Sequence, residues 1–271
     1  MSLLHALLLG LVQGFTEFLP VSSSGHLALV PWLFRWDDFG GDQALENAFD
    51  VALHLGTLLG ALAYLRDDVR RYGTALLASL AGRPHDAPSA RLGGLLLVTA
   101  VPTGLLGLLV LSSTEDLGDR TWLVAACLIG FGLLLGVADR RPGDRDVGSL
   151  RVRDALLLGV AQGLAFQPGV SRAGAALTAA RFLGVERAAA ARFVFLMSLP
   201  VIAGAGLASA VDVRVPAEWW PAFAVGTAAA AVSGWFAVHG MLRLLASRGM
   251  GGFVAYRVLA GLAVLLVLAF R

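Results

Sequence analysis

The chain has 271 residues, of which 57% are hydrophobic and 15% are charged, and its mean hydropathy is +0.75. Soluble domains carry roughly 25% charged residues, so the composition excludes a soluble globular protein and indicates an integral membrane protein. The pI near 9.2 does not indicate a nucleic-acid partner, because the basic residues lie in short loops between apolar runs.

Eight apolar segments follow one another along the chain, and six of them are long enough to cross a bilayer of roughly 30 Å. The other two contain Pro, Gly and Ser in their middle. Since irregular backbone at membrane depth occurs only inside protein or beside a water-filled cavity, we expect each to be a re-entrant helix–loop–helix hairpin. In chain order the prediction is a hairpin at 3–34, spans at 48–65, 92–111 and 122–138, a hairpin at 155–184, and spans at 193–211, 219–238 and 252–270.

The loop charges predict the orientation of these segments. Segments 66–91 and 139–153 carry five Arg each, and the positive-inside rule places them in the cytoplasm. Arg243, Arg248 and Arg257 mark the start of the last span on the same side. The first hairpin then opens to the outer side and the second to the cytoplasm. The alternate loops are acidic and contain Asp37, Asp38, Asp42, Glu46 and Asp50, then Glu115, Asp116 and Asp119, then Asp212 and Glu218.

A polar motif occurs once in each hairpin. The first copy reads LLGLVQGFTEFLPVSSSGH from position 8, and the second reads LLGVAQGLAFQPGVSRAG from position 157. Gln13 recurs as Gln162, and after a one-residue shift Ser23 recurs as Ser171. Two such segments in corresponding halves of a membrane protein indicate one shared site near the midplane.

The order of hairpins and spans predicts an inverted repeat. Each half has one hairpin and three spans, and an odd number of spans gives the two halves opposite orientations. The predicted fold is an all-α polytopic membrane protein with an inverted-topology repeat, six transmembrane helices and two re-entrant hairpins. It forms a single membrane domain, 1–271, with a first repeat at 1–150 and a second at 151–271.

The hairpin tips concentrate groups suited to a phosphate ester or anhydride. Ionisable residues at membrane depth, here Glu17 and Arg172, usually mark function and are paired, and the guanidinium fork of Arg suits phosphate oxygens. His26 adds an imidazole, whose reference pKa near 6.5 suits proton transfer. Hydroxyls and amides at a helix N-terminus bind anions. On this basis the candidate phosphate-binding residues are Arg172, Ser171, Ser22, Ser24, Gly25, Ala173 and Gly174.

Each of these residues also has a simpler interpretation. Glu17 and Arg172 could form only a structural ion pair, and His26 could be a hydrogen-bonding residue at the outer interface. Any single serine could be a helix cap. We expect His54, in the middle of the first span, to donate a hydrogen bond between helices.

The two motifs resemble those of the undecaprenyl-pyrophosphate phosphatases of bacteria, the bacitracin-resistance family. The resemblance covers essentially the whole chain and is most specific at QGFTEFLPVSSSGH (13–26) and PGVSRAG (168–174). It implies hydrolysis of undecaprenyl pyrophosphate to undecaprenyl phosphate and inorganic phosphate at the outer side of the bacterial cytoplasmic membrane. That reaction recycles the lipid carrier for cell-wall synthesis. The resemblance also implies a Mg²⁺ or Ca²⁺ cofactor, and it leaves the oligomeric state, including a homodimer, open.

The resemblance assigns roles to individual residues. Glu17 takes the position of the family's essential glutamate, a metal ligand or general base, and Gln13 opens its E/Q-x-x-x-E pattern and is a second candidate metal ligand. His26 matches the catalytic histidine, Ser23 the motif serine and Arg172 the phosphate-binding arginine. The attacking group stays open between His26, Ser23 and water.

The second motif departs from the family's pattern, PGxSRSGxT. Ala173 and Ala176 stand where that pattern has a serine and a threonine, which predicts altered or weaker phosphate binding. A flippase that returns undecaprenyl phosphate across the membrane is the alternative function, because inverted repeats with midplane hairpins are also typical of transporters.

Overall fold

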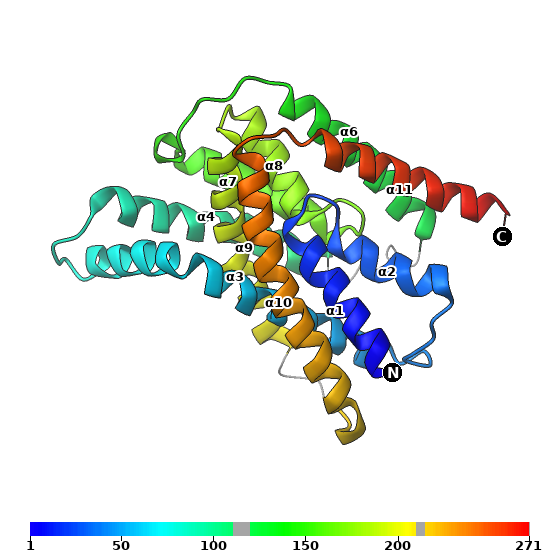
Figure 1. Cartoon of the computed structure of the whole chain (residues 1–271). Helices are drawn as coiled ribbons and strands as arrows, with labels where there is room; N and C mark the ends of the chain where they lie inside the picture. Colours follow the sequence, from blue (N-terminus) through cyan, green and yellow to red (C-terminus); the bar gives the residue numbers. More distant parts are fainter. Residues whose placement is uncertain (111–119, 210–214, 271) are drawn as a thin grey trace.

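A computed structural model describes residues 1–110, 120–209 and 215–270, and helices dominate these residues. Within these described residues, six helices are long and apolar enough to cross a membrane, which confirms the prediction of an all-α polytopic membrane protein (Figure 1). They are α3 (Gln43–Leu80), α4 (Ala87–Val110), α6 (Thr121–Asp139), α9 (Arg187–Ser209), α10 (Trp220–Leu245) and α11 (Gly251–Phe270).

Four shorter helices form the two hairpins. The first hairpin consists of α1 (Leu3–Phe18) and α2 (Ser23–Phe34), and the second of α7 (Val152–Gly163) and α8 (Arg172–Phe182). In both hairpins the chain leaves helical geometry ahead of the proline at the tip, as expected for a residue that lacks an N–H and restricts its predecessor. Three single-turn helices, η1 (Val147–Ser149), η2 (Leu164–Phe166) and η3 (Ala217–Trp219), complete the described elements.

Helix α3 continues well beyond the predicted end of its span at residue 65, to Leu80. Arg70 and Arg71 therefore lie on a helix and not in a loop, which corrects the sequence-based boundary. A helix can leave the membrane when its side chains find polar partners, and Asp68 of this extension binds Arg192 of α9 at 2.7 Å. The predicted acidic positions Glu115, Asp116, Asp119 and Asp212 lie outside the described residues.

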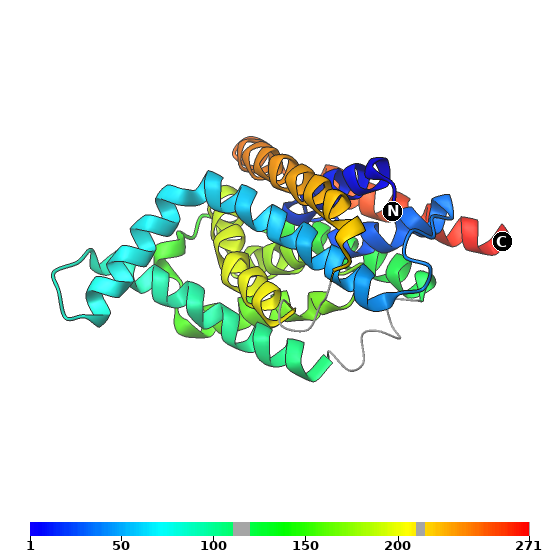
Figure 2. The ribbon, with the colours of Figure 1, turned by 90° about the horizontal axis from the view of Figure 1, so that it is seen from below.

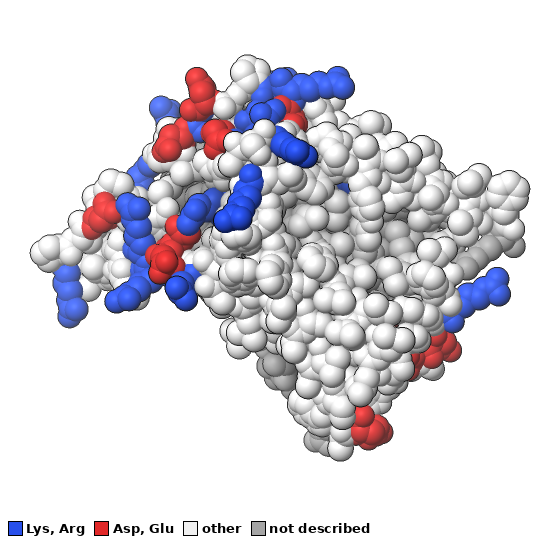
Figure 3. Space-filling view, in the orientation of Figure 1, with Lys and Arg blue, Asp and Glu red and all other residues white. Residues whose placement is uncertain are grey.

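The charged residues gather at two ends of the molecule, with a broad uncharged zone between them (Figure 3). Most of the Arg side chains lie along one edge of the molecule and at the projecting end where α3 is followed by α4. This projection is visible in both ribbon views (Figures 1 and 2). A smaller group, mostly acidic, lies at the opposite end. This separation is the one expected of a protein whose middle lies in lipid.

The open ends of the two hairpins lie in these two charged regions. In the first hairpin, His5 Nδ1 lies 2.8 Å from Asp38 Oδ2 in the acidic segment before α3. In the second, the carboxylate of Asp154 binds the N–H of Arg151 at 2.9 Å and the guanidinium of Arg145. Burial raises the pKa of Asp154, but these hydrogen bonds outweigh it and hold the pKa below the usual range.

The first helix of each hairpin packs mainly against a span from the other half of the chain. Helix α1 packs mainly on α10, and α7 packs mainly on α4. Both contacts depend on a glycine of the repeated motif. A Cβ atom at Gly10 would lie 2.3 Å from the carbonyl oxygen of Gly226, and one at Gly159 would lie 2.2 Å from that of Thr99. The exchange of partners supports the inverted repeat, whose boundaries at 1–150 and 151–271 stay a prediction.

The main buried apolar cluster surrounds α8 and α9 at the centre of the molecule. A second cluster lies between α1, α3 and α10 toward the acidic end. The hairpin tips are therefore held between two packed regions.

Candidate active site

The tips of the two hairpins meet inside the protein, where α1, α2 and α8 converge (Figure 1). The Ser22 hydroxyl accepts the N–H of Gly169 from the other tip at 3.0 Å. The same hydroxyl caps α2 by accepting the N–H of Gly25, and Ser171 caps α8 by accepting the N–H of Gly174. The contact confirms that the two copies of the motif meet.

The caps correct the alignment of the two motif copies. Ser22 and Ser171 both have positive φ angles, 77° and 76°, which are unfavourable for a residue with a side chain and are retained where the surroundings impose them. Ser171 therefore corresponds to Ser22 and not to Ser23. The one-residue shift is confined to the loop before the cap. It follows that the first helical residues, Ser23 in α2 and Arg172 in α8, are structural counterparts.

These two counterpart residues bind the same carboxylate. Ser23 donates its hydroxyl to Glu17 Oε2 at 2.7 Å, and Arg172 Nη2 donates to Glu17 Oε1 at 2.7 Å. Gln13, one turn earlier on α1, donates its amide to Oε2 at 2.9 Å. The Glu17 side chain is only 2% exposed, so Arg172 supplies the positive charge that a buried carboxylate requires.

A polar pocket of about 230 Å³ lies next to this carboxylate. Its polar lining residues are Ser23, Ser24, His54, Ser171 and Arg172, and three of them, Ser23, His54 and Arg172, contact Glu17. The pocket therefore has hydroxyls and a guanidinium on its wall and a carboxylate behind them. The first turns of two helices add backbone N–H groups without helical acceptors, so the pocket is suited to an anion.

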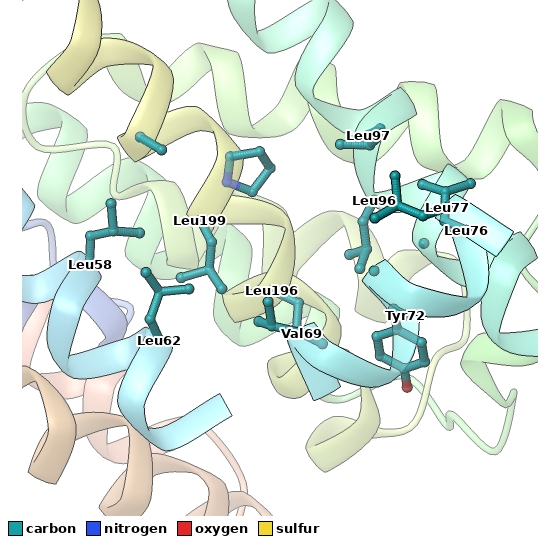
Figure 4. Close-up of a pocket in the computed structure, with 14 residues that line it drawn as sticks. Leu58, Leu62, Val69, Tyr72, Leu76, Leu77, Leu96, Leu97, Leu196 and Leu199 are labelled. Atoms are coloured by element: carbon teal, nitrogen blue, oxygen red, sulfur yellow. The ribbon is translucent and has the colours of Figure 1, made fainter. Parts of the chain in front are cut away.

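A larger groove of about 420 Å³ lies elsewhere, between α3, α4 and α9 (Figure 4). Leucines and other apolar residues line it, together with Tyr72. It has none of the carboxylate, guanidinium or imidazole groups that the reaction of a phosphate requires, so we assign the chemistry to the smaller pocket.

His26 lies on the other side of the first tip. Its Nδ1 is 2.6 Å from the carbonyl oxygen of Ser22, and its Nε2 is 2.6 Å from the hydroxyl of Tyr256 in α11. A carbonyl can only accept, so Nδ1 carries a proton and Nε2 accepts from Tyr256 in the neutral ring. His26 does not line the polar pocket, and its predicted catalytic role stays a prediction.

The residues predicted to bind phosphate at the starts of α2 and α8 differ in what they can offer a ligand. The N–H groups of Gly25 and Gly174 are taken by the serine caps, so these two residues do not offer an amide to a ligand in this structure. Ser24 lines the pocket. Ala173 is buried at the first turn of α8, and Ala176 is completely buried one turn further on. The hydroxyls that the family pattern has at these two positions are absent here, and α8 is capped without them.

Comparison with known proteins identifies the family of this chain. The family model described as "Bacitracin resistance protein BacA" matches residues 6–263. The chain belongs to the BacA family. Its relatives include proteins named "Undecaprenyl-diphosphatase" from Thermomicrobium roseum, 42% identical over 100% of this chain and 99% of the relative, and from Pelobacter propionicus, 43% identical over 99% and 98%. A protein of the same name from Nocardioides is 41% identical over 98% of this chain and 96% of its own.

One buried charge of this BacA-family chain was misplaced by sequence reasoning. Arg257 was expected to mark the cytoplasmic start of the last span, but it lies inside α11 and is completely buried. Its guanidinium donates to backbone carbonyls of both tips and of α6. Five carbonyl oxygens accept hydrogen bonds from the buried guanidinium and compensate for the loss of hydration. They are those of Pro20 (3.0 Å), Gly169 (2.8 Å), Val170 (2.9 Å), Leu128 (3.1 Å) and Cys127 (3.4 Å).

His54 is the second residue whose position changes its interpretation. The sequence indicated a hydrogen bond between helices, and the ring of this α3 residue does face another helix, with Nε2 3.5 Å from Glu17 Oε2 of α1. The sequence did not indicate that the ring also lies at the wall of the pocket. The spacing between positions 17 and 54 gives no signal of this contact, because it depends on how α3 crosses α1.

The donor groups of this BacA-family site suit a metal ion only in part. The described residues contain no cluster of three or more His, Cys, Asp or Glu side chains that could hold one, and the Glu17 oxygens already bind Arg172, Ser23 and Gln13. Gln13 Oε1 is buried without a hydrogen-bond partner. A single carboxylate matches a Mg²⁺ ion that takes its remaining ligands from substrate phosphates and water.

Proposed function

We propose that this protein hydrolyses undecaprenyl pyrophosphate to undecaprenyl phosphate and inorganic phosphate. The observation that supports it best is the buried Glu17 carboxylate, which binds a hydroxyl and a guanidinium at the wall of an anion-suited pocket. A hydroxyl beside a carboxylate can pass its proton to that carboxylate while its oxygen attacks phosphorus. A guanidinium can stabilise the negative charge that develops on the phosphate oxygens. The names of the relatives give the substrate.

The reaction needs one bond to form and one to break at phosphorus. We propose that the terminal phosphate binds in the pocket through Arg172 and through those first-turn amides of α2 and α8 that the serine caps do not take. The oxygen of Ser23, or a water molecule in its place, forms the new bond and passes its proton to Glu17. The bond to the bridging oxygen breaks, and that oxygen takes up the proton from Glu17, which restores the carboxylate. If Ser23 attacks, water then releases the phosphate from it in a second step of the same kind.

The proposal also gives roles to His26 and to a metal ion. His26 can exchange a proton with the substrate only after Nε2 releases the Tyr256 hydroxyl, so its proposed catalytic role requires a change in that contact. We propose that Mg²⁺ or Ca²⁺ is held by Glu17, with Gln13 as a second oxygen donor and the substrate as the source of further ligands. When bound, the ion supplies charge neutralisation to the phosphate oxygens.

The charged ends support a proposal for where the reaction takes place. We propose that the protein lies in the bacterial cytoplasmic membrane with its Arg-rich end in the cytoplasm, as the positive-inside rule requires. The first hairpin, which carries Glu17 and Ser23, opens toward the acidic end. The polar head of the substrate therefore enters from the outer side, and its prenyl chain stays among membrane lipids.

The test is phosphate release from farnesyl and undecaprenyl pyrophosphate by the purified protein. Glu17→Gln and Arg172→Ala are expected to lower kcat/KM at least about a hundredfold. His239→Ala is the control, because His239 of α10 contacts Tyr64 and is not among the residues that line the pocket. Turnover that is equal in all four proteins, or absent across metals and pH, would contradict the proposal. Movement of undecaprenyl phosphate between leaflets without phosphate release would favour a flippase.

A further inference from the structure

One face of helix α3 borders both the polar pocket and the larger apolar groove. Val51 and His54 line the pocket, and Leu58 lies near one end of the groove, with Tyr72 and Leu76 near the other (Figure 4). The spacing of these positions places them on the same face of the helix, because a helix face recurs every three or four residues. The groove therefore begins on α3 about one turn beyond the pocket.

Helix α9 borders the same two spaces. Ile202 and Gly206 line the pocket, whereas Leu199 and Ala203 line the groove. Residues three or four apart are neighbours on a helix surface, so the pocket pair and the groove pair lie side by side. The α9 wall of the pocket is apolar, and the opposite contribution, from α8, includes Arg172. Together the two spaces match a ligand that has a charged head and an apolar chain.

The groove lies within the part of the protein that spans the membrane. Gly93 of α4 and Leu196 of α9 line it, and both belong to candidate membrane spans. Tyr72 lies at the level of Gly93, because a Cβ atom at Gly93 would be 2.8 Å from the Tyr72 carbonyl oxygen. Leu77 and Leu97 at the groove wall are more than half exposed, so one side is open to lipid. Hydrocarbon fills such a groove, since an empty one forfeits the dispersion contacts of its lining.

We infer that the groove holds the prenyl chain of the lipid whose pyrophosphate lies in the pocket, and that it thereby selects long chains. This inference rests on the proposed function, from which it takes the substrate. Among the described residues that line the groove, Tyr72 alone has a polar side chain. A bilayer phospholipid would therefore gain in the groove only apolar contacts of the kind that other lipids already give it. The substrate chain, in contrast, is anchored at one end by its pyrophosphate.

The route of the substrate also directs its chain along the groove. A lipid of the outer leaflet points its chain toward the opposite leaflet. A head that enters the pocket from the outer side therefore leaves the chain directed toward the Arg-rich end. The groove runs in that direction, from Leu58 to Leu77 in the extension of α3 that carries Arg70 and Arg71. Repeats beyond the groove remain among membrane lipids.

The groove is long enough to distinguish prenyl chains by length. Helix α3 rises about 1.5 Å per residue, so its stretch from Leu58 to Leu77 covers roughly 28 Å. With carbon–carbon bonds of about 1.5 Å, each four-carbon repeat of an extended prenyl chain advances roughly 5 Å, and the groove takes about five repeats. Gly73, which also lines the groove, lies roughly 22 Å beyond Leu58. A chain of about three repeats ends before Gly73, and a chain of about eight passes it.

The experiment measures the affinity of the full-length protein in nanodiscs for two prenyl methylene-bisphosphonates, which cannot be hydrolysed at the bridging carbon. One probe has about three isoprene repeats and the other about eight, and their affinities are compared at equal mole fractions in the bilayer. We expect the unsubstituted protein to bind the longer probe about fivefold more tightly, because the later repeats add dispersion contacts with the groove.

Gly73→Leu blocks the far part of the groove and leaves the pocket unchanged. A Cβ atom at Gly73 meets nothing within 4 Å, so the fold accommodates the substitution. We expect this variant to bind both probes with the affinity that the unsubstituted protein has for the shorter one. Leu97→Phe narrows the same part of the groove from α4 (Figure 4) and is expected to reduce the preference for the longer probe.

Gly104→Leu is the matched control. Gly104 also leaves room for a Cβ atom, but it is not among the residues that line the groove, so this variant is expected to keep the full preference. Equal binding of the two probes by the unsubstituted protein would overturn the inference and indicate that bilayer lipids fill the groove. Gly73→Leu and Leu97→Phe variants that keep the preference, or that lose the same affinity for both probes, would also overturn it.

Failure of the proposed function is a separate result. It appears as binding of the two bisphosphonates, with or without a preference for length, but without phosphate release from the corresponding pyrophosphates. The preference for the longer probe therefore tests the groove, and phosphate release tests the reaction.

Discussion

Arg257 provides the sharpest test of how the two hairpin tips are held together. Three of its acceptors, Pro20, Gly169 and Val170, are loop carbonyls outside the helices. Methionine at position 257 would keep the apolar stem and remove every donor. We therefore predict that Arg257→Met destabilises the protein strongly.

The size of the effect follows from those three carbonyls. A buried acceptor that loses its donor costs about 1–3 kcal/mol, so three acceptors give roughly 3–9 kcal/mol if nothing relaxes. The loops can shift to recover part of this, and we expect a net loss of about 4 kcal/mol, which is typical of a broken buried charge network. Arg257→Lys keeps the charge but has no planar fork to reach carbonyls on several segments, so we expect an intermediate loss.

The assay is unfolding of the purified protein in mixed micelles with increasing SDS, followed by circular dichroism. Arg243→Met is the matched control, because Arg243 is exposed in the last turn of α10 and surface substitutions usually change stability by no more than about 0.5 kcal/mol. If both variants unfold at the same SDS fraction as the unsubstituted protein, the Arg257 contacts do not hold the tips and the reasoning is refuted.

Three further predictions concern packing, pH and His26. Gly10→Ala and Gly159→Ala should each lower the free energy of unfolding by about 1–3 kcal/mol through overpacking. Gly104→Ala, where a Cβ meets nothing within 4 Å, is the control and should leave the SDS midpoint unchanged. Equal midpoints in all three variants would refute the close contacts. The lowered pKa of Asp154 stabilises the fold above the unfolded pKa of about 3.9, and this contribution is lost as the pH falls through the folded pKa. Asp154→Asn should therefore flatten the decline of the unfolding midpoint below about pH 5, and an unchanged slope would argue against it. His26→Ala should lower the rate of phosphate release at least about tenfold. Tyr256→Phe keeps the ring whose centroid lies 5.7 Å from that of His26, so it should lower the rate no more than about threefold. Equal losses in the two variants would make this pair purely structural.

The sequence predicted the helical segments well where the signal is local. Apolar length and the prolines of the two tips gave the six spans and the positions where the hairpins turn. The end of α3 was missed by fifteen residues, since its predicted end was at 65 and the helix ends at Leu80. Hydropathy reports where a helix leaves lipid, and it does not report where the helix itself ends.

The candidate site was predicted in part. The pairing of Glu17 with Arg172 and the contribution of Ser23 follow from the expected meeting of the tips, and the structure has both contacts. The one-residue shift in the second motif misaligned the serines, because letters alone do not show that Ser22 and Ser171 share a cap and a positive φ. Their backbone geometry identifies Ser23 and Arg172 as counterparts.

The amino-acid sequence by itself determined the membrane class, the two interrupted hairpins and the chemistry gathered in their motifs. These properties depend on the transfer of short segments into lipid and on residues that break helices, and both are local. Only the tertiary structure decided that His54 and not His26 faces Glu17, and that Arg257 joins both tips from inside α11. Those contacts join residues far apart in the chain, so they depend on how the helices cross, which no single segment encodes.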